Sequence, residues 1–199
     1  MKTRIAVLVS GGGTNLQALL DAEAQGRIPH GEIALVVSNN PKAYALERAK
    51  QAGVPAAVLD KAGSQADFED RLQRILELDG IDLIILAGFM RILTGRFTAK
   101  WPNRILNVHP SLIPAFCGQG FYGLRVHAAA LARGVKLTGA TVHYVNEIPD
   151  GGPILLQKAV EVLPEDTPET LQRRVMEQAE WILLPQAAEL AARQLAEQA

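Results

Sequence analysis

Cysteine is nearly absent from this sequence. Among 199 residues the only one is Cys117, so no intramolecular disulfide can form, and the spacings typical of zinc ligands are missing. The sequence therefore predicts no metal site and a reducing environment. Cys117 sits among Gly118, Gly120 and Gly123, and we interpret it as a bystander thiol rather than a nucleophile.

An excess of charge of one sign and a long apolar run are missing as well. The 20 Lys and Arg residues balance 21 Asp and Glu residues, for a formal net charge of −1, so no broad basic surface indicates a nucleic-acid partner. Only about six apolar positions precede the glycines at 11–13, which suits a strand but is too short for a signal-peptide core or a membrane span. We expect a cytoplasmic protein without a nucleic-acid or membrane partner.

The composition is otherwise that of an ordinary globular domain. Hydrophobic residues make up 48% and charged residues 21%. The length fits one large domain that can bury a full core without cross-links. No repeat, low-complexity tract or linker interrupts the chain, so we predict a single domain over residues 1–199.

Predicted strands and helices alternate along the first half of the chain. Apolar runs predict the strands, and apolar residues at helical spacing predict the helices between them. In chain order these are strand 5–9, helix 15–24, strand 33–37, helix 43–52, strand 54–59, helix 66–79 and strand 81–86. Because the strands are apolar on both faces, this order predicts a parallel, doubly wound sheet flanked by helices.

The second half has a different pattern. A strand at 104–108 leads into a loop rich in Gly and Pro, and a helix is predicted at 126–132. Two longer strands, at 138–145 and 154–162, are predicted to pair antiparallel. A long helix is predicted from residue 168 to the end, with a kink at Pro185. The fold class is therefore α/β, with a mostly parallel sheet and a late antiparallel strand pair.

A glycine-rich turn follows the first predicted strand, at residues 10–15 (SGGGTN). In open parallel sheets, ligands bind beyond the carboxyl ends of strands. The turn is no dinucleotide fingerprint, because Leu16 stands where Gly or Ala is required, and without a lysine it is no P-loop. Free amides at the start of the following helix favour a cradle for one phosphate. The structural alternative is a tight turn capped by Thr14 or Asn15.

Asn107 and His109 follow the same logic at the end of a later strand. They are two positions apart, so on an extended segment both side chains leave the same face. An amide donor and a titratable imidazole suit a tetrahedral intermediate, because Asn stabilises the oxyanion while His moves a proton. A lone His at a strand end is also a common structural feature.

Asp150 begins a DGGP sequence at 150–153, between the two late strands. Such a sequence is ordinarily a turn, but a carboxylate there could orient His109. Spacing alone cannot bring the two together.

His127 is expected near the surface of a helix, and His143 is expected to be packed and hydrogen-bonded in a strand. The pair Arg173-Arg174 is interpreted as a solvated helix face.

Four motifs together resemble those of the glycinamide ribonucleotide formyltransferases, within the folate-dependent formyltransferases. The resemblance covers nearly the whole chain. The motifs are SGGGTNLQA at 10–18, LAGFMRIL at 86–93, NVHPSLIP at 107–114, and the stretch from the TG at 138–139 to the DGGP at 150–153. The first motif is the more specific for this family, and the third marks the wider formyltransferase fold, which is Rossmann-like.

The resemblance implies roles for particular residues. It implies a catalytic trio of Asn107, His109 and Asp150, and a substrate-phosphate loop of Gly12, Gly13, Thr14 and Asn15. It implies a folate pocket formed by Met90, Arg91, Ile92, Leu93, Val145, Asn146 and Glu147. Family members have a Glu-His pair in the C-terminal helix, and the nearest match here is Glu180-Trp181, displaced by one inserted residue. Glu180 is thus the candidate for the ribonucleotide contact. The loop at 116–125 is similar to that of only some members.

The implied reaction is formyl transfer in purine synthesis. The formyl group of 10-formyltetrahydrofolate, a cosubstrate, passes to the primary amine of glycinamide ribonucleotide, giving formylglycinamide ribonucleotide and tetrahydrofolate without a metal. The amine attacks directly, Asn and His stabilise the oxyanion, and Asp and His relay the proton. Residues 1–100 would form a phosphate-binding half and residues 101–199 a folate-binding and catalytic half, in a monomer or homodimer.

Two other enzymes of the same fold differ from this sequence at its ends. A 10-formyltetrahydrofolate hydrolase would have an additional N-terminal domain, whereas the first strand here begins at residue 4. A methionyl-tRNA formyltransferase would have a basic, β-rich C-terminal domain, whereas this sequence ends in a helix rich in Ala, Glu and Gln.

Two further classes are less compatible with the sequence. A module that only binds a phosphorylated metabolite would not need the Asn107, His109 and Asp150 trio. A nicotinamide-dependent oxidoreductase is disfavoured by Leu16 and by the SNN sequence at 38–40, which lacks the acidic residue expected after the second strand.

Overall fold

The computed structural model describes residues 2–60 and 62–198, and their strands form one seven-stranded sheet. The strand order is β3-β2-β1-β4-β5-β6-β7. The first five strands are parallel, and β6 and β7 are antiparallel to their neighbours. The strands are β1 (Thr3–Val9), β2 (Gly31–Ser38), β3 (Ala56–Val58), β4 (Leu83–Leu86), β5 (Ile105–His109), β6 (Leu137–Tyr144) and β7 (Ile154–Glu161). The predicted mostly parallel sheet with a late antiparallel pair is confirmed.

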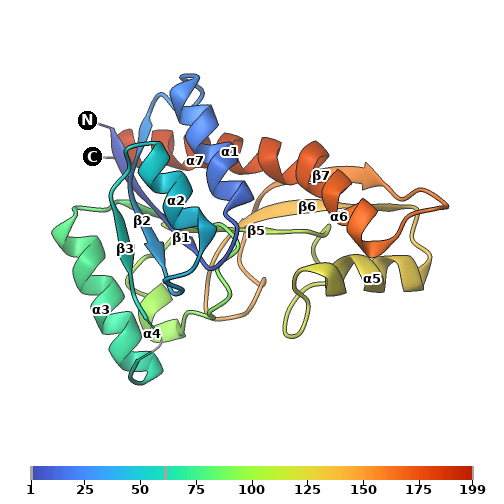
Figure 1. The fold of residues 1–199 in the computed structure, drawn as a ribbon, viewed down its shortest axis with the longest axis horizontal. Coiled ribbons are helices and arrows are strands. Elements are labelled where there is room, and N and C mark those ends of the chain that lie inside the picture. The colour runs from blue at the N-terminus through green and yellow to red at the C-terminus, as the bar shows by residue number, and fades with distance from the viewer. Residues whose placement is uncertain (1, 61, 199) are drawn as a thin grey trace.

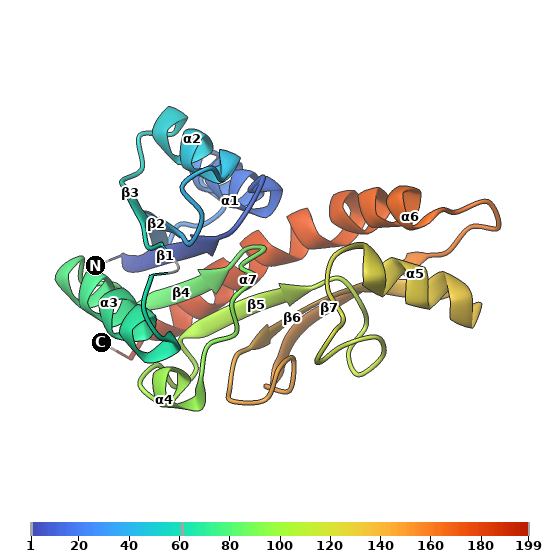
Figure 2. The same ribbon diagram turned by 60° about the horizontal axis from the view of Figure 1, so that its bottom comes forward.

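Helices cover both faces of this sheet (Figures 1 and 2). Helices α1, α2 and α7 pack on one face, and α3 and α4 pack on the other. Helix α5 lies beside α6 at the far end of the sheet. The helices are α1 (Thr14–Ala24), α2 (Tyr44–Gln51), α3 (Gln65–Leu78), α4 (Gly95–Thr98), α5 (Leu124–Arg133), α6 (Pro168–Val175), the π-helical η1 (Met176–Glu180) and α7 (Trp181–Ala196).

The side chains of β1 show why the sheet is buried on both sides. Ile5 and Val7 belong to the core under α1 and α7, while Ala6 and Leu8 belong to the core under α3. All four are fully buried. Alternate residues of a strand point to opposite faces, so a continuous apolar run is needed when both faces are covered.

Several predicted bounds differ from those observed. Strand β3 has three residues rather than the six expected, because Pro55 precedes it and has no N–H with which to extend the ladder. Helix α4 was not predicted, since four residues carry no periodicity. The C-terminal helix runs through Pro185 without ending there, and its irregular turn is the π-helical η1 just before α7.

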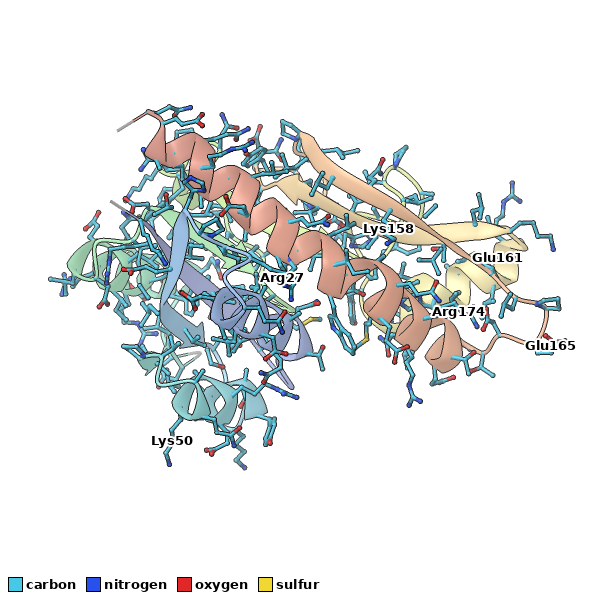
Figure 3. The ribbon with its side chains drawn as sticks, turned by 90° about the horizontal axis from the view of Figure 1, so that it is seen from above. Arg27, Lys50, Lys158, Glu161, Glu165 and Arg174 are labelled. Atoms are coloured by element: carbon cyan, nitrogen blue, oxygen red, sulfur yellow. The ribbon has the colours of Figure 1, made fainter. Side chains whose placement is uncertain are left out.

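Arg174 corrects one expectation about the surface. Arg173 is exposed as predicted, but the guanidinium of Arg174 binds the carboxylate of Asp166 through both terminal nitrogens. It also donates to the carbonyl of Glu161 at the end of β7 (Figure 3). These bonds hold the turn between β7 and α6 in place.

Among the described residues, no helix combines the length and apolar character needed to cross a bilayer.

Candidate active site

A cleft of about 620 Å³ opens beyond the ends of β1, β4 and β5. It is lined by the start of α1, the segment after β4, the end of β5, the loop before α5 and the loop after β6. Since β6 is antiparallel to β5, the loop after Tyr144 begins near the start of β5, where Val145 N–H donates to the Ile105 carbonyl at 2.9 Å. The cleft thus extends along β5 from His109 to the loop after β6.

Asn107, His109 and Asp150 meet in this cleft. The Asp150 carboxylate lies 3.5 Å from the Asn107 amide nitrogen through Oδ1 and 3.5 Å from His109 Nδ1 through Oδ2. His109 is only 4% exposed. The spacing of Asp150 and His109 in the sequence did not predict their contact, and the fold brings them together.

The loop after β6 is shaped to deliver this carboxylate. Asp150 has a left-handed backbone, with φ of 55°. Gly152 lies so close to the strand that an added Cβ would sit 1.8 Å from the Tyr144 carbonyl oxygen, so only glycine fits there. The N–H of Gly118 donates to Asp150 Oδ2 at 2.8 Å. The loop before α5 therefore also fixes the carboxylate.

The charge of Asp150 follows from its neighbours. Burial alone would raise the pKa of Asp150, but the hydrogen bond with His143, the charge of His109 and the Gly118 N–H together hold this pKa below its usual value. Asp150 is therefore ionised at neutral pH.

His109 is held by oxygen atoms on both sides of its ring. Its Nε2 lies 2.9 Å from the Phe116 carbonyl oxygen, while its Nδ1 faces Asp150. Only the imidazolium form can donate to both acceptors at once. The two ring nitrogens of His109 thus face two different oxygen atoms, one of them on the carboxylate of Asp150.

His143 belongs to the same cluster, a role that the sequence reasoning missed. It is buried and hydrogen-bonded, as predicted, with Nδ1 2.9 Å from the Tyr144 carbonyl oxygen. Its Nε2 lies 3.2 Å from the Asn107 amide nitrogen and 3.5 Å from Asp150 Oδ1. The contact arises because Asn107 and His143 are cross-strand partners of β5 and β6. The predicted antiparallel pairing was the available signal, but it did not give the register.

His127 is buried, which contradicts its predicted place near the surface. Its side chain is fully covered, lines the cleft, and has no hydrogen-bond partner for either ring nitrogen among the described residues. Burial, and next the charge of His109, lower the pKa of His127 to about 4. The imidazole is therefore neutral. Helix α5 turns its His127 face inward together with Val126 and Ala130.

The glycine turn after β1 leads to one end of the cleft, which Thr14 and Asn15 line and Gly12 and Gly13 do not. Gly13 precedes α1 with φ of 72°, and an added Cβ would sit 2.6 Å from the Cβ of Ala45. Among the described residues no side chain caps α1, which argues against the capped-turn alternative. The first amides of a helix have no partner within the helix and can bind a ligand. Thr14 and Asn15 line the cleft, and Gly12 is open to solvent with its carbonyl bound by Arg48.

Glu180 reaches the same end of the cleft from η1. It lines the cavity and accepts a 2.8 Å hydrogen bond from the Asn15 amide. Burial raises the pKa of Glu180, against the lowering effect of Asn15. A π turn holds more residues than an α turn, so η1 takes up an additional residue where the sequence showed the displacement.

Two walls enclose the other end of the cleft, and both contain the residues that the resemblance implied. On one wall Met90 and Ile92 are largely exposed to the cleft, while Leu93 is buried. Arg91 lines the cleft too, but its guanidinium lies 4.1 Å above the Phe68 ring. The opposite wall contains Val145, Asn146 and Glu147.

Cys117 lies beside the cluster without the properties of a nucleophile. Burial, and next the negative charge of Asp150, raise the pKa of the Cys117 thiol. Its Sγ contacts the Pro114 carbonyl at 3.3 Å.

Within residues 2–60 and 62–198, no group of three or more His, Cys, Asp or Glu side chains is arranged to hold a metal ion.

Known proteins are similar to this chain in sequence and in fold. A formyl transferase family model matches residues 3–187. Phosphoribosylglycinamide formyltransferase of Haemophilus influenzae is 45% identical over 177 residues, which are 88% of this chain and 81% of that protein. The trifunctional purine biosynthetic protein adenosine-3 of Gallus gallus is 46% identical over 96% of this chain, which spans only 18% of that protein.

A solved structure with a related name is also similar to this chain. The crystal structure of glycinamide ribonucleotide transformylase 1 from Symbiobacterium toebii is 47% identical and superposes with a TM-score of 0.90, covering 97% of this chain and 89% of that one. The chain belongs to the formyl transferase family, in its phosphoribosylglycinamide formyltransferase branch.

Proposed function

We propose that this chain transfers the formyl group of 10-formyltetrahydrofolate to the primary amine of glycinamide ribonucleotide, giving formylglycinamide ribonucleotide and tetrahydrofolate in purine biosynthesis. The observation that carries the proposal is the Asp150 carboxylate, which lies 3.5 Å from both the Asn107 amide and the His109 imidazole. The relatives with this activity support it. The cytoplasmic location stays a prediction.

The cleft offers a separate place for each substrate. The ribonucleotide phosphate would bind the free amides of Gly13, Thr14 and Asn15, at the positive end of α1. Glu180, next to Asn15, would accept hydrogen bonds from the ribose hydroxyls. The folate would lie between the wall at 90–93 and the wall at 145–147. Its formyl group would then meet the amine beside Asn107.

The side chains of the cluster would act on the formyl carbon as it is attacked. The neutral amine forms the new C–N bond, and the formyl oxygen becomes an oxyanion. Asn107 and the protonated His109, released from the Phe116 carbonyl, donate hydrogen bonds to that oxyanion, each worth about 3–4 kcal/mol. Asp150 stabilises the imidazolium and takes up the proton that the amine loses. The C–N bond to folate breaks as His109 or that relay protonates the leaving nitrogen.

A single assay separates this function from its rivals. Tetrahydrofolate release is measured with purified chain and 10-formyltetrahydrofolate, with and without glycinamide ribonucleotide. The proposal expects release only when the ribonucleotide is present, with one formyl group transferred per folate. Equal release without the amine would indicate a hydrolase. Binding of both ligands without any release would indicate a module that holds a phosphorylated metabolite.

A further inference from the structure

The wall at 90–93 and the adjoining Thr94 are fastened to helix α3 by a buried carboxylate, that of Glu69. This side chain is 1% exposed and lies on the α3 face towards the wall. It does not line the cleft. A carboxylate withdrawn from water is costly unless hydrogen bonds satisfy its oxygens. The partners of Glu69 therefore show what it does.

Both oxygens of Glu69 bind the same residue, Thr94, and Arg96 Nη2 forms a longer ion pair with Oε2 at 3.8 Å. Its backbone N–H donates to Oε1 at 2.7 Å and its hydroxyl donates to Oε2 at 2.6 Å. Charge-assisted hydrogen bonds of this kind are among the stronger ones in proteins. Two bonds at different atoms fix the position and the orientation of the Thr94 backbone, where one bond would leave it free to rotate.

Gln65, one turn before Glu69 on α3, extends the attachment along the wall. Its amide nitrogen donates to Glu69 Oε1 at 2.8 Å and to the Ile92 carbonyl at 3.0 Å. Its amide oxygen accepts from Arg91 Nε at 2.6 Å. The wall is thus held through backbone and side-chain atoms, while Met90 and Ile92 stay free to face the cleft.

The Thr94 position also sets the width of the cleft. Gly95, the next residue, lies against the opposite wall, because an added Cβ there would sit 3.1 Å from the Cβ of Glu147. A shift of Thr94 would therefore move the contact between the two walls.

We propose that Glu69 is a positioning residue that fixes the wall at 90–94 and its distance from the wall at 145–147, so that the formyl-folate binds between them. The inference rests on the proposed function, since that function assigns the folate to this part of the cleft. Glu69 would act on binding of the folate and not on the Asn107, His109 and Asp150 chemistry.

The test compares two substitutions on the same helix. Glu69→Leu removes the acceptors at similar volume, and the control Glu77→Leu changes an exposed residue whose side chain accepts a hydrogen bond from Gln73 within α3. We expect Glu69→Leu to raise KM for 10-formyltetrahydrofolate about tenfold, with kcat and KM for the ribonucleotide within about threefold. Glu77→Leu should leave all three within about twofold. Tetrahydrofolate titration by calorimetry should show the same loss of affinity.

Glu69→Gln provides the rescue. The Gln oxygen can accept from the Thr94 N–H while its NH2 group donates to the Thr94 hydroxyl, so KM for the folate should stay within about threefold of wild type. An unchanged folate KM in Glu69→Leu, or an equal rise of both KM values, would overturn the positioning role. If Glu69→Leu does not fold, Thr94→Val replaces it in the test. We expect Thr94→Val to raise KM for the folate about threefold, and an unchanged KM for the folate would overturn the positioning role.

One more variant separates this inference from the proposed function. Ile92→Asp places a charge on the exposed face of the wall and should abolish tetrahydrofolate binding. If Ile92→Asp abolishes binding and Glu69→Leu does not weaken it, the positioning role fails and the folate site stands. If Ile92→Asp binds tetrahydrofolate like wild type, the assignment of the folate to this wall fails.

Discussion

The carboxylate of Asp150 lies 3.5 Å from the imidazole of His109, although one comes from a loop and the other from the end of a strand. The register of β5 and β6 starts that loop beside Ile105, and the Gly118 N–H fixes the carboxylate beside the imidazole. The fold itself thus places the imidazole next to its carboxylate partner.

Asp150→Asn should lower kcat about 10²–10⁴-fold, the range typical of general acid–base groups, because the amide can neither stabilise the imidazolium nor accept the proton of the amine. The KM values should change much less. Steady-state kinetics with both substrates varied measures this. Asp60→Asn is the control, since Asp60 is an exposed carboxylate that pairs with Arg71 away from the cleft. Full activity of Asp150→Asn would refute the assigned trio.

Gly13→Ala should weaken binding of the ribonucleotide and destabilise the fold by about 1–3 kcal/mol, because φ is positive and the new Cβ would overlap Ala45. Gly11→Ala is a matched control, since nothing lies within 4 Å of its added Cβ and its φ is not positive. Urea unfolding and the KM for the ribonucleotide measure the two effects. Equal behaviour of the two variants would contradict the close packing of this turn.

His127 should make stability depend on pH in mild acid. Its pKa is about 4 in the fold against about 6.5 when exposed, so the unfolded chain binds the extra proton first. The stability is fully present above pH 6.5 and is lost as pH falls through 4. His127→Leu should remove about 3 kcal/mol of that pH dependence, measured as the difference in urea-unfolding free energy between neutral pH and pH 4. Parallel curves for wild type and variant would speak against a buried neutral imidazole.

Cys117→Ser should keep kcat and both KM values within about twofold, because the thiol is protonated and takes no part in the reaction. In the wild type, a thiol-specific reagent should react more slowly at neutral pH than with a free cysteine, and the rate should rise in alkali. A variant without activity would require a role for the thiol.

The order of the main helices and strands was predictable, because apolar runs and helical spacing repeat over many residues. Short or irregular elements were not. Helix α4 has four residues and η1 has five, which is too few for a periodic pattern. Strand β3 was predicted too long because Pro55 is apolar, although it accepts a hydrogen bond from Val36 and has no N–H to donate.

The site was predictable as a set of residues but not as an arrangement. Asn107 and His109 share a strand, so their common face followed from the period of two. The contacts of Asp150, His143 and Glu69 depend on the pairing of β6 and the packing of α3, which local patterns do not encode. His127 was misplaced because the alanines after it, at 128–130, give no contrast between a polar and an apolar face.

The π-helical turn at Met176–Glu180 separates two demands on one long helix. An additional residue in a regular α-helix would rotate everything beyond it by about 100°. Here one wide turn absorbs the residue, so Leu171 and Val175 before it and Leu183 and Leu184 after it all remain buried. Glu180 meanwhile keeps its bond to Asn15. One inserted residue is therefore accommodated at this turn, while the buried residues on either side of it and the ribonucleotide end of the cleft keep their positions.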